Sequence, residues 1–410
     1  MTNAIELTAV ARRRRTAVAL VVLSQWLGTS LWYSPSGAAD GLMARLAIDS
    51  AAFGWLIAAT QLGFIAGTLA FAATGTADRF GASRIFAVSC VAGAATNAAL
   101  ALAGVEYAAA WALRFAVGLC LAGIYPLGMK MIVQWVEGRP AAALGWLVGM
   151  LTLGTAMPHA LRASGASWPW EAVLIASSLL ALVGAVLVLF LGDGPFAAPP
   201  RKPGAASAGP GTVWQVFRVP AFRASAFGYF GHMWELYAFW SVLPWLCEAI
   251  VTELARRGDS APSVALLSFG VIAAGGVGCV LGGQWSRRIG SAPVAALALA
   301  GSGLMCISYP LLPEHALGLR IAALFFWGFC VVADSPQFSA LSSQFAPPQL
   351  LGSALVAQNG IGFLITVASI LVLSRAVPAW GATAMWILVP GPVLGLCALR
   401  PLLARSRRAS

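Results

Sequence analysis

The sequence of 410 residues is poor in charge, since only 10% of its residues are Asp, Glu, Lys or Arg while 60% are hydrophobic. A soluble globular chain carries roughly 25% charged residues. So few charges leave too little polar surface to cover a body in water, and the mean hydropathy of +0.83 points the same way. The composition therefore excludes an ordinary soluble domain, and we expect a lipid bilayer to cover the chain.

Lysine is nearly absent, with two residues against 23 arginines, and the net charge is +11. A basic chain could bind nucleic acid, but this one has no basic stripe with interleaved aromatic residues. Its basic residues stand instead between apolar segments, where membrane proteins carry them. We expect no nucleic-acid partner. The preference for Arg, with abundant Ala and Gly, is typical of a GC-rich genome and favours the plasma (inner) membrane of a bacterium.

Signatures of enzymes and cofactors are also missing. No phosphate-binding G-x-x-x-x-G-K-[ST] sequence occurs, which disfavours an ATP-driven pump. The seven cysteines form no C-x-x-C pair and lie mostly in apolar segments, so we interpret them as small core residues. We expect no enzymatic activity, no cofactor and no metal. An intramembrane enzyme and a receptor without flux are the alternatives, and measured solute flux would discriminate among them.

Twelve apolar segments approach the roughly 20 residues that cross a bilayer core as a helix. They are 16–38, 53–73, 85–103, 107–133, 142–162, 170–191, 221–246, 263–284, 292–312, 319–341, 352–374 and 381–403. The sequence therefore predicts an all-α membrane protein with twelve transmembrane helices. Arg12 to Arg15 precede the first segment as in a signal peptide, but many equal segments follow, so we interpret it as a first span.

The basic residues of the connections are distributed unequally between the two sides. One side holds 17 of them, and the other side, which includes Arg320, holds 6. The remaining two, Arg114 and Lys130, lie within spans. Because cytoplasmic connections carry the excess of Lys and Arg, we expect both termini in the cytoplasm.

The longest central connection, 193–220, is rich in Pro, Gly and Ser and predicts a flexible cytoplasmic linker. It divides the chain into 1–192 and 221–410, with six predicted helices each. The halves resemble copies, because 114–126 matches 324–336 at an offset of 210 residues, with Phe, Gly, Cys and Pro in common. Two pseudo-symmetric six-helix bundles are typical of secondary transporters, whose substrate site lies between the repeats near the midplane.

The connection between the second and third spans reads T-G-T-A-D-R-F-G-A-S-R over 74–84. It resembles the cytoplasmic signature G-x-x-x-D-R-x-G-x-x-R of the major facilitator superfamily, although Thr74 replaces the first glycine. With twelve spans divided six and six, the resemblance covers nearly the whole chain. It implies a gate latch formed by Asp78, Arg79, Gly81 and Arg84, with Asp78 against the N-terminus of helix 11. The alternative is a short basic turn that only sets topology.

Two further glycine patterns bear on the same family. Arg114-x-x-x-Gly118-x-Cys120 resembles a signature of helix 4, R-x-x-x-G-x-G, that is linked to proton coupling, but the last glycine is absent. Helix 5 carries Gly149, Gly154 and Pro158 without the Gly-Pro of the efflux-type motif, which weakens a drug-antiporter interpretation. Such small-residue spacing also packs membrane helices closely, so packing is the alternative.

Four charged residues lie inside predicted spans: Arg114, Lys130, Glu235 and Asp334. Each costs about 2.5–3.5 kcal/mol at the bilayer centre on insertion scales, so we expect them to face the interior or one another. Lys130 lies near the cytoplasmic end, where it can snorkel to the interface or pair with Asp334.

Helical spacing and the resemblance together predict the substrate site. Tyr229, His232 and Glu235 share one face of helix 7. Gln25, Thr29, Trp32 and Ser36 share one face of helix 1 by the same rule. The resemblance implies that helices 1, 4, 7 and 10 line the central path. The predicted substrate-binding residues are Gln25, Trp32, Arg114, Tyr125, Tyr229, His232, Gln358 and Asn359. Packing or an interfacial belt is the alternative for the aromatic residues.

We therefore expect a monomeric secondary transporter that moves a small polar or anionic metabolite by alternating access, driven by protons. Arg114 could fork onto a carboxylate or phosphate. Glu235 is the predicted proton-coupling residue, because burial disfavours its charged form, and Asp334 is the next candidate. His232 could relay or tune that proton, and Arg114 could hold the Glu235 carboxylate ionised instead of binding the solute. A static brace between Glu235 and Arg114 or His232 is the alternative role. Proton-antiport efflux of amphipathic drugs is the alternative function, favoured by 16 Trp and 20 Phe.

Overall fold

The computed structural model describes residues 2–74, 76–102, 104–136, 141–164, 168–197, 214–347 and 351–409. Within these residues every regular element is a helix, which confirms the predicted all-α fold. The first half contains α1 (Thr2–Thr29), α2 (Ser34–Gly37), α3 (Ala39–Leu46), α4 (Ser50–Thr74), α5 (Thr76–Arg79), α6 (Ala82–Ala99), α7 (Tyr107–Ala122), α8 (Tyr125–Trp135), α9 (Ala141–Ser164) and α10 (Glu171–Leu191). The second half contains η1 (Trp214–Arg218), α12 (Pro220–Arg256), α13 (Val264–Ile289), α14 (Ser291–Ser308), η2 (Tyr309–Leu311), α15 (Leu317–Ala333), α16 (Ser335–Phe345), α17 (Leu351–Trp380), η4 (Gly381–Leu388) and α18 (Pro390–Ala409).

Nine stretches of the described residues are long and apolar enough to cross a membrane. One of them, Ala357–Arg405, is 49 residues long and includes most of α17, then η4 and most of α18, so it holds two passes. Helices α1 and α6 are not among the nine, but they pack between the others as the first and third passes. The described chain is thus consistent with the twelve predicted spans.

The outward faces of the helices are apolar. On α10, Leu179, Val183, Val186 and Leu189 are exposed, and Phe190 is 87% exposed. A row of large apolar side chains along one helix is stable where lipid covers it, because hydrocarbon offers no competing polar contact. The exposed apolar belt therefore marks the lipid-facing surface.

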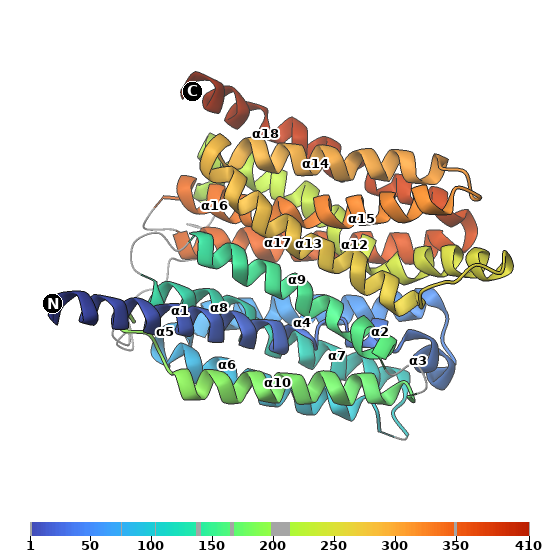
Figure 1. The fold of residues 1–410 in the computed structure, drawn as a ribbon, viewed down its shortest axis with the longest axis horizontal. Coiled ribbons are helices and arrows are strands. Elements are labelled where there is room, and N and C mark those ends of the chain that lie inside the picture. Colours follow the sequence, from blue (N-terminus) through green and yellow to red (C-terminus); the bar gives the residue numbers. More distant parts are fainter. Residues whose placement is uncertain are drawn as a thin grey trace.

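The two halves lie side by side, with the first half (blue to green) below the second (yellow to red) in Figure 1. The N-terminus and the C-terminus lie at the same end of the molecule (Figure 1). We call this end the inner end, after the predicted position of the termini, and the opposite end, where α3 lies, the outer end.

Both halves use the same helix pairings, which is the structural counterpart of the sequence repeat. In the first half α10 packs on α1 and α6, and α7 packs on α4 and α6. In the second half α18 packs on α12 and α14, and α15 packs on α13 and α14. Gly118 of α7 and Gly328 of α15 both bring two helix backbones so close that a Cβ would collide with the neighbouring helix. The two bundles are therefore pseudo-symmetric.

The repeat also places a break in equivalent spans. The fourth pass stops at Gly123–Ile124 between α7 and α8, and the tenth stops at Asp334 between α15 and α16. In each case a proline, Pro126 or Pro336, is the second residue of the following helix, where its missing N–H leaves no bond unmade. The predicted spans 107–133 and 319–341 are therefore each two helices rather than one.

Two other sequence-based placements differ from the structure. The predicted first span, 16–38, is one helix only to Thr29, and a turn over 30–33 separates it from α2. Arg320, which we placed in an outer connection, lies in α15 and is only 7% exposed. The apolar run 16–38 has no proline next to Thr29 that marks the break there. Arg320 lies inside α15 because this helix begins at Leu317, earlier than predicted.

Candidate functional site

The halves meet along a seam formed chiefly by α4 with α17 and by α9 with α13. Between α9 and α13 the backbones approach closely, because a Cβ on Gly149 would lie 3.2 Å from the carbonyl oxygen of Gly276. The seam is the place where a solute site of the predicted kind would lie.

Six aromatic residues fill the seam, and we call them the seam aromatics. Trp32, Tyr33 and Phe64 come from the first half, and Tyr237, Trp240 and Phe363 come from the second. Ring centroids lie 5.9 Å apart for Trp32 and Tyr237, 5.9 Å for Tyr33 and Trp240, and 4.5 Å for Phe64 and Phe363. The Tyr33 hydroxyl donates a hydrogen bond of 3.2 Å to the carbonyl oxygen of Tyr237. These contacts hold the two halves together.

Several polar atoms in and near the seam are buried without a hydrogen-bond partner among the described residues. They include the indole N–H groups of Trp32 and Trp240, both amide ends of Gln25 and Gln61, and Oε1 of Gln358. Gln61 lies beside the hydroxyl of Tyr33. Buried polar groups are normally hydrogen-bonded, so a solute or water that entered the seam would satisfy these groups.

Arg114 lies inside the first half, fully buried in α7. Its Nε donates to Thr60 Oγ1 at 3.2 Å. Its Nη1 donates to Ser34 Oγ at 3.3 Å and to Asn97 Oδ1 at 2.8 Å. Its Nη2 donates to the carbonyl oxygens of Leu31 and Trp32, at 3.1 Å and 2.7 Å. A guanidinium has five N–H groups, so in this conformation none is left for a solute anion.

The same bonds explain the shape of the first span. Because α1 ends at Thr29, the carbonyl groups of the next residues lack helical partners. Arg114 supplies two of those partners, at Leu31 and Trp32, and so supports the turn that carries Trp32 and Tyr33. Arg114 therefore positions two seam aromatics instead of meeting Glu235.

Glu235 lies in α12 and is 1% exposed. Its Oε1 accepts from Nε1 of Trp327 at 2.6 Å and from Sγ of Cys306 at 3.3 Å, and its Oε2 accepts from Oγ of Ser302 at 2.8 Å. All three donors belong to α14 or α15, so the carboxyl group faces the interior of the second half. Three donors around one carboxyl group suit its ionised form, which only accepts.

One turn away on α12, His232 faces Asp334 at the break between α15 and α16. The distance between Nδ1 of His232 and Oδ1 of Asp334 is 2.8 Å, and each side chain is 1% exposed. The contact is poorly aligned for a regular hydrogen bond, so we describe it as an electrostatic contact. Tertiary packing thus places His232 against Asp334, whereas the sequence had suggested that His232 acts together with Glu235.

The other predicted solute ligands lie toward the inner side of the seam aromatics. Tyr125 is the first residue of α8 and is close enough to Tyr229 for an electrostatic interaction between the two halves. Tyr229 packs against His232 and Phe338, with ring centroids 6.0 Å and 6.3 Å away. On α17, Gln358 is buried and Asn359 is half-buried. Their roles as ligands stay predictions.

The predicted gate loop contains a contact that the sequence did not indicate. The backbone N–H of Ser83, in the first turn of α6, donates to Oδ1 of Asp193 at 2.9 Å. Asp193 lies just after the end of α10, and its side chain therefore caps the start of α6. A Cβ on Gly81 would collide with the other carboxylate oxygen of Asp193. Arg79 and Arg84 are exposed. The side chain of Asp78 lies outside the described residues, so its predicted contact with helix 11 stays a prediction.

Sequence reasoning missed most of the partners of the buried charges. Asn97 is a strongly polar residue inside an apolar segment, and that signal could have marked it. Ser302, Cys306 and Trp327 carry no such signal, because serine, cysteine and tryptophan are common in membrane helices. Asp193 had been assigned to the flexible linker, although Phe196, three residues later, donates its backbone N–H to the carbonyl oxygen of Gln134 at 3.1 Å.

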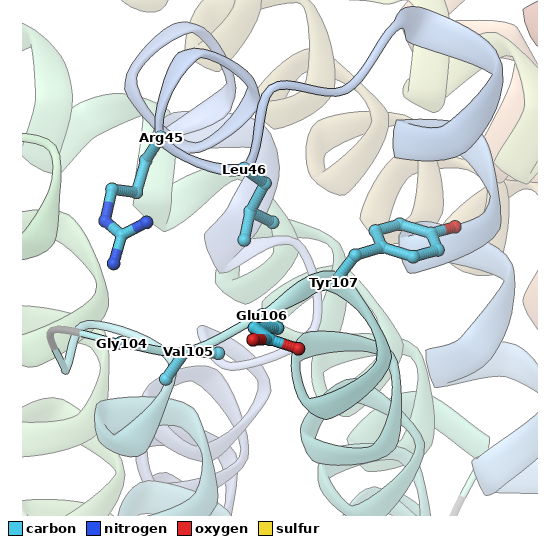
Figure 2. Close-up of a pocket in the computed structure, with 6 residues that line it drawn as sticks. All are labelled: Arg45, Leu46, Gly104, Val105, Glu106 and Tyr107. Carbon is cyan, nitrogen blue, oxygen red and sulfur yellow. The ribbon is translucent and has the colours of Figure 1, made fainter.

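An open pocket of about 370 Å³ lies at the outer end of the first half. Figure 2 shows its lining by Arg45, Leu46, Gly104, Val105, Glu106 and Tyr107. These residues come from the end of α3, the connection before α7 and the first residue of α7, so the pocket belongs to one half and not to the seam. Among the described residues no group of three or more His, Cys, Asp or Glu could hold a metal ion.

Comparison with known proteins agrees with this architecture. The family model of the Major Facilitator Superfamily matches residues 18–370. The chain belongs to this superfamily, and we describe it as a membrane transporter of that class. No curated protein sequence matches the chain.

A solved structure shares the fold. It is a bacterial homologue of the human lysosomal transporter Spinster, in an inward-facing and unoccupied conformation. The TM-score is 0.68 at 15% sequence identity, and the match covers 96% of this chain and 97% of that one. At this identity the likeness concerns the fold alone.

Proposed function

We propose that this transporter moves a small polar solute across the bacterial plasma membrane by alternating access at the seam, coupled to protons. The observation that carries the proposal is the pair of indole N–H groups, Trp32 and Trp240, which belong to different halves and have no partner among the described residues. A solute that accepts from both would be held by both halves at once. Such a solute would stabilise the state in which the halves close around it.

The chemistry of the seam favours an uncharged polar solute over an anion. Its unpartnered groups are amides and indole N–H groups, while all N–H groups of Arg114 are used within the first half. A site built from neutral hydrogen-bonding groups recognises a solute by its donors and acceptors, and rejects an analogue that leaves those groups unpaired. The anionic part of the sequence-based expectation thereby loses its main support.

Proton coupling is proposed to reside in the second half. Glu235, His232 and Asp334 are buried together there, and a buried carboxyl group gains or loses its proton as its surroundings change. The proton site is therefore separate from the seam, and helix α12 joins them because it carries both Glu235 and Tyr237.

The test is transport by the purified protein in lipid vesicles. A thermal-shift screen with neutral polar metabolites identifies a binding solute, and its uptake is then measured with and without an imposed pH difference. We expect Glu235→Gln to abolish accumulation driven by the pH difference while retaining exchange at equal concentrations. Accumulation by this variant would remove Glu235 from the coupling role and make Asp334 the candidate. If no binding solute crosses the membrane through the wild-type protein, the transport proposal fails.

Efflux of amphipathic compounds is the second candidate, and the six seam aromatics favour it. Aromatic rings provide large apolar contact area with some adaptability, which suits solutes of varied shape. A set of aromatic cations and neutral dyes in the same screen separates the two candidates. Broad binding of such compounds, with none to small polar metabolites, would favour efflux.

A further inference from the structure

We propose that Trp327 is a proton-sensitive clamp between α12 and α15, through which Glu235 controls closure of the outer part of the seam. This inference rests on the proposed proton coupling and adds the residue that converts a proton into movement. Trp327 lies in α15 and is fully buried. It is a positioning residue, because it acts through Glu235 and the seam aromatics without contacting the solute.

Trp327 contacts α12 at two residues one helical turn apart. Its indole N–H donates to Oε1 of Glu235 at 2.6 Å. Its ring stacks on Phe239, with centroids 4.4 Å apart and planes inclined by 22°. Glu235 and Phe239 are four residues apart and so lie on one face of the helix. One side chain of α15 thus holds one face of α12 by a polar contact and an apolar contact.

The clamped part of α12 carries two seam aromatics. Tyr237 and Trp240 lie beside Phe239 in the chain, and both contact Tyr33 of the first half. Because a helix turn moves as a unit, a shift of α12 relative to α15 moves both rings relative to Tyr33. The clamp and the seam are therefore joined by a short, stiff segment.

A proton on Glu235 weakens the polar half of the clamp. The ionised carboxyl group accepts at both oxygens, and hydrogen bonds to a charged group are roughly twice as strong as neutral ones. The neutral acid loses this charge and turns one oxygen into a donor, so it accepts less well from three neighbours. Release of Trp327 then leaves only the stack on Phe239 to hold α12.

The groups that act on Glu235 come from α14, from α15 and from the break after α15. Helix α14 contributes Ser302 and Cys306, α15 contributes Trp327, and Asp334 acts from the break after α15. On α12 itself His232 faces Asp334. Beyond Trp327 lie Tyr309, at 5.9 Å between ring centroids, and Arg320, whose guanidinium stands 5.0 Å over the Tyr309 ring. Among the described side chains, Trp327 is the one that bonds to Glu235 and also stacks on Phe239.

The experiment measures the distance between the halves at the outer end, without any solute. Spin labels are placed at Arg45→Cys in α3 and Ala255→Cys near the end of α12, both exposed positions, in a Cys397→Ser background that removes an exposed thiol. The full chain is studied in lipid nanodiscs over a range of pH. For the unaltered clamp we expect the short distance at high pH and a growing long-distance population at low pH, with a change of about tenfold in their ratio.

Trp327→Phe keeps a ring for Phe239 and removes the N–H. We expect this variant and Glu235→Gln to keep the low-pH distance ratio at every pH. Trp386→Phe is the matched control, because it removes an exposed indole N–H that donates to the carbonyl oxygen of Ile307, and it should respond to pH as the unaltered clamp does. Phe239→Leu keeps the Glu235 contact and removes the stack, so its distances should still respond to pH, with a larger long-distance population at low pH.

The outcomes separate this inference from the proposed proton coupling. A Trp327→Phe protein that retains the full pH response, while Glu235→Gln has lost it, overturns the clamp and leaves the coupling intact. A pH response that is absent from the unaltered clamp, or that survives in Glu235→Gln, overturns the coupling role of Glu235 itself. Thermal unfolding of each variant verifies that it is folded before the distances are compared.

Discussion

Buried charged residues in this membrane protein are stabilised by their hydrogen bonds, and Arg114 makes the most of them in the candidate site. Five acceptor oxygens surround its guanidinium group. If Arg114 were removed, each of these buried oxygens would lose a hydrogen-bond donor. The planar fork of an arginine can reach all five, whereas the compact ammonium group of a lysine cannot. The charge of Arg114 is therefore held in place within the first half.

The first prediction follows from this geometry. Arg114→Lys keeps the charge but offers three donors in place of five, so we expect a loss of about 2 kcal/mol in stability. The midpoint of thermal unfolding of the purified protein measures it. Arg84→Lys, at an exposed position, is the control and should unfold as the wild-type protein does. An unchanged midpoint for Arg114→Lys would mean that the five contacts contribute little.

At the scale of elements, the loop between α4 and α6 is tied to the segment after α10. Asp193 caps α6 through Ser83, and Gly81 leaves room for that carboxylate. The requirement is steric rather than conformational, because φ of Gly81 is −59°, which any residue can adopt. The equivalent glycine of the second half, Gly290, differs in having a φ of +86°.

The second prediction tests this tie with a double-mutant cycle. Gly81→Ala should push Asp193 away and cost about 1 kcal/mol, the worth of a helix cap. In an Asp193→Ala background the same change should cost much less, because the colliding carboxylate is gone. Gly283→Ala is the control, since its Cβ would meet no atom within 4 Å. Equal costs of Gly81→Ala in both backgrounds would show that the two residues act independently.

At the scale of the whole molecule, the two halves are held by few polar contacts and many ring contacts. The bond from Tyr33 to the Tyr237 carbonyl joins the halves directly. The third prediction is that Tyr33→Phe removes about 1 kcal/mol from the closed state and raises the outward-open population roughly fivefold. Labels at the outer end, as described for the clamp, measure the populations. Tyr107→Phe, which loses a bond to Ala52 within the first half, should leave them unchanged.

The fourth prediction concerns orientation in the membrane. The excess of Arg lies at the end that carries the termini, and cytoplasmic connections carry such an excess. A membrane-impermeant thiol reagent should label Arg45→Cys in intact cells, and Arg218→Cys only after permeabilisation. Both positions are exposed. The reverse pattern would mean that the protein is inserted with its termini outside.

Features that depend on each span separately could be predicted from the sequence, whereas contacts between distant residues could not. Apolar runs, their number and their repeat already defined twelve spans in two halves, because the bilayer imposes a length and a polarity on each span separately. The family was also recognisable from the 74–84 loop. The breaks at Ile124 and Asp334 were not predicted, although the repeat contains a signal for them. They are 210 residues apart, and each is followed two residues later by a proline.

Only the tertiary structure decided which buried groups meet. Glu235 was expected to face Arg114 or His232, but it bonds to Trp327, Ser302 and Cys306, while Arg114 bonds within its own half. Helical spacing defines which residues share a face, but not the direction in which that face points. In lipid that direction depends on close packing at small residues, such as Gly118 and Gly328, and on hydrogen bonds between helices. These contacts join residues far apart in the chain, so no local pattern could reveal them.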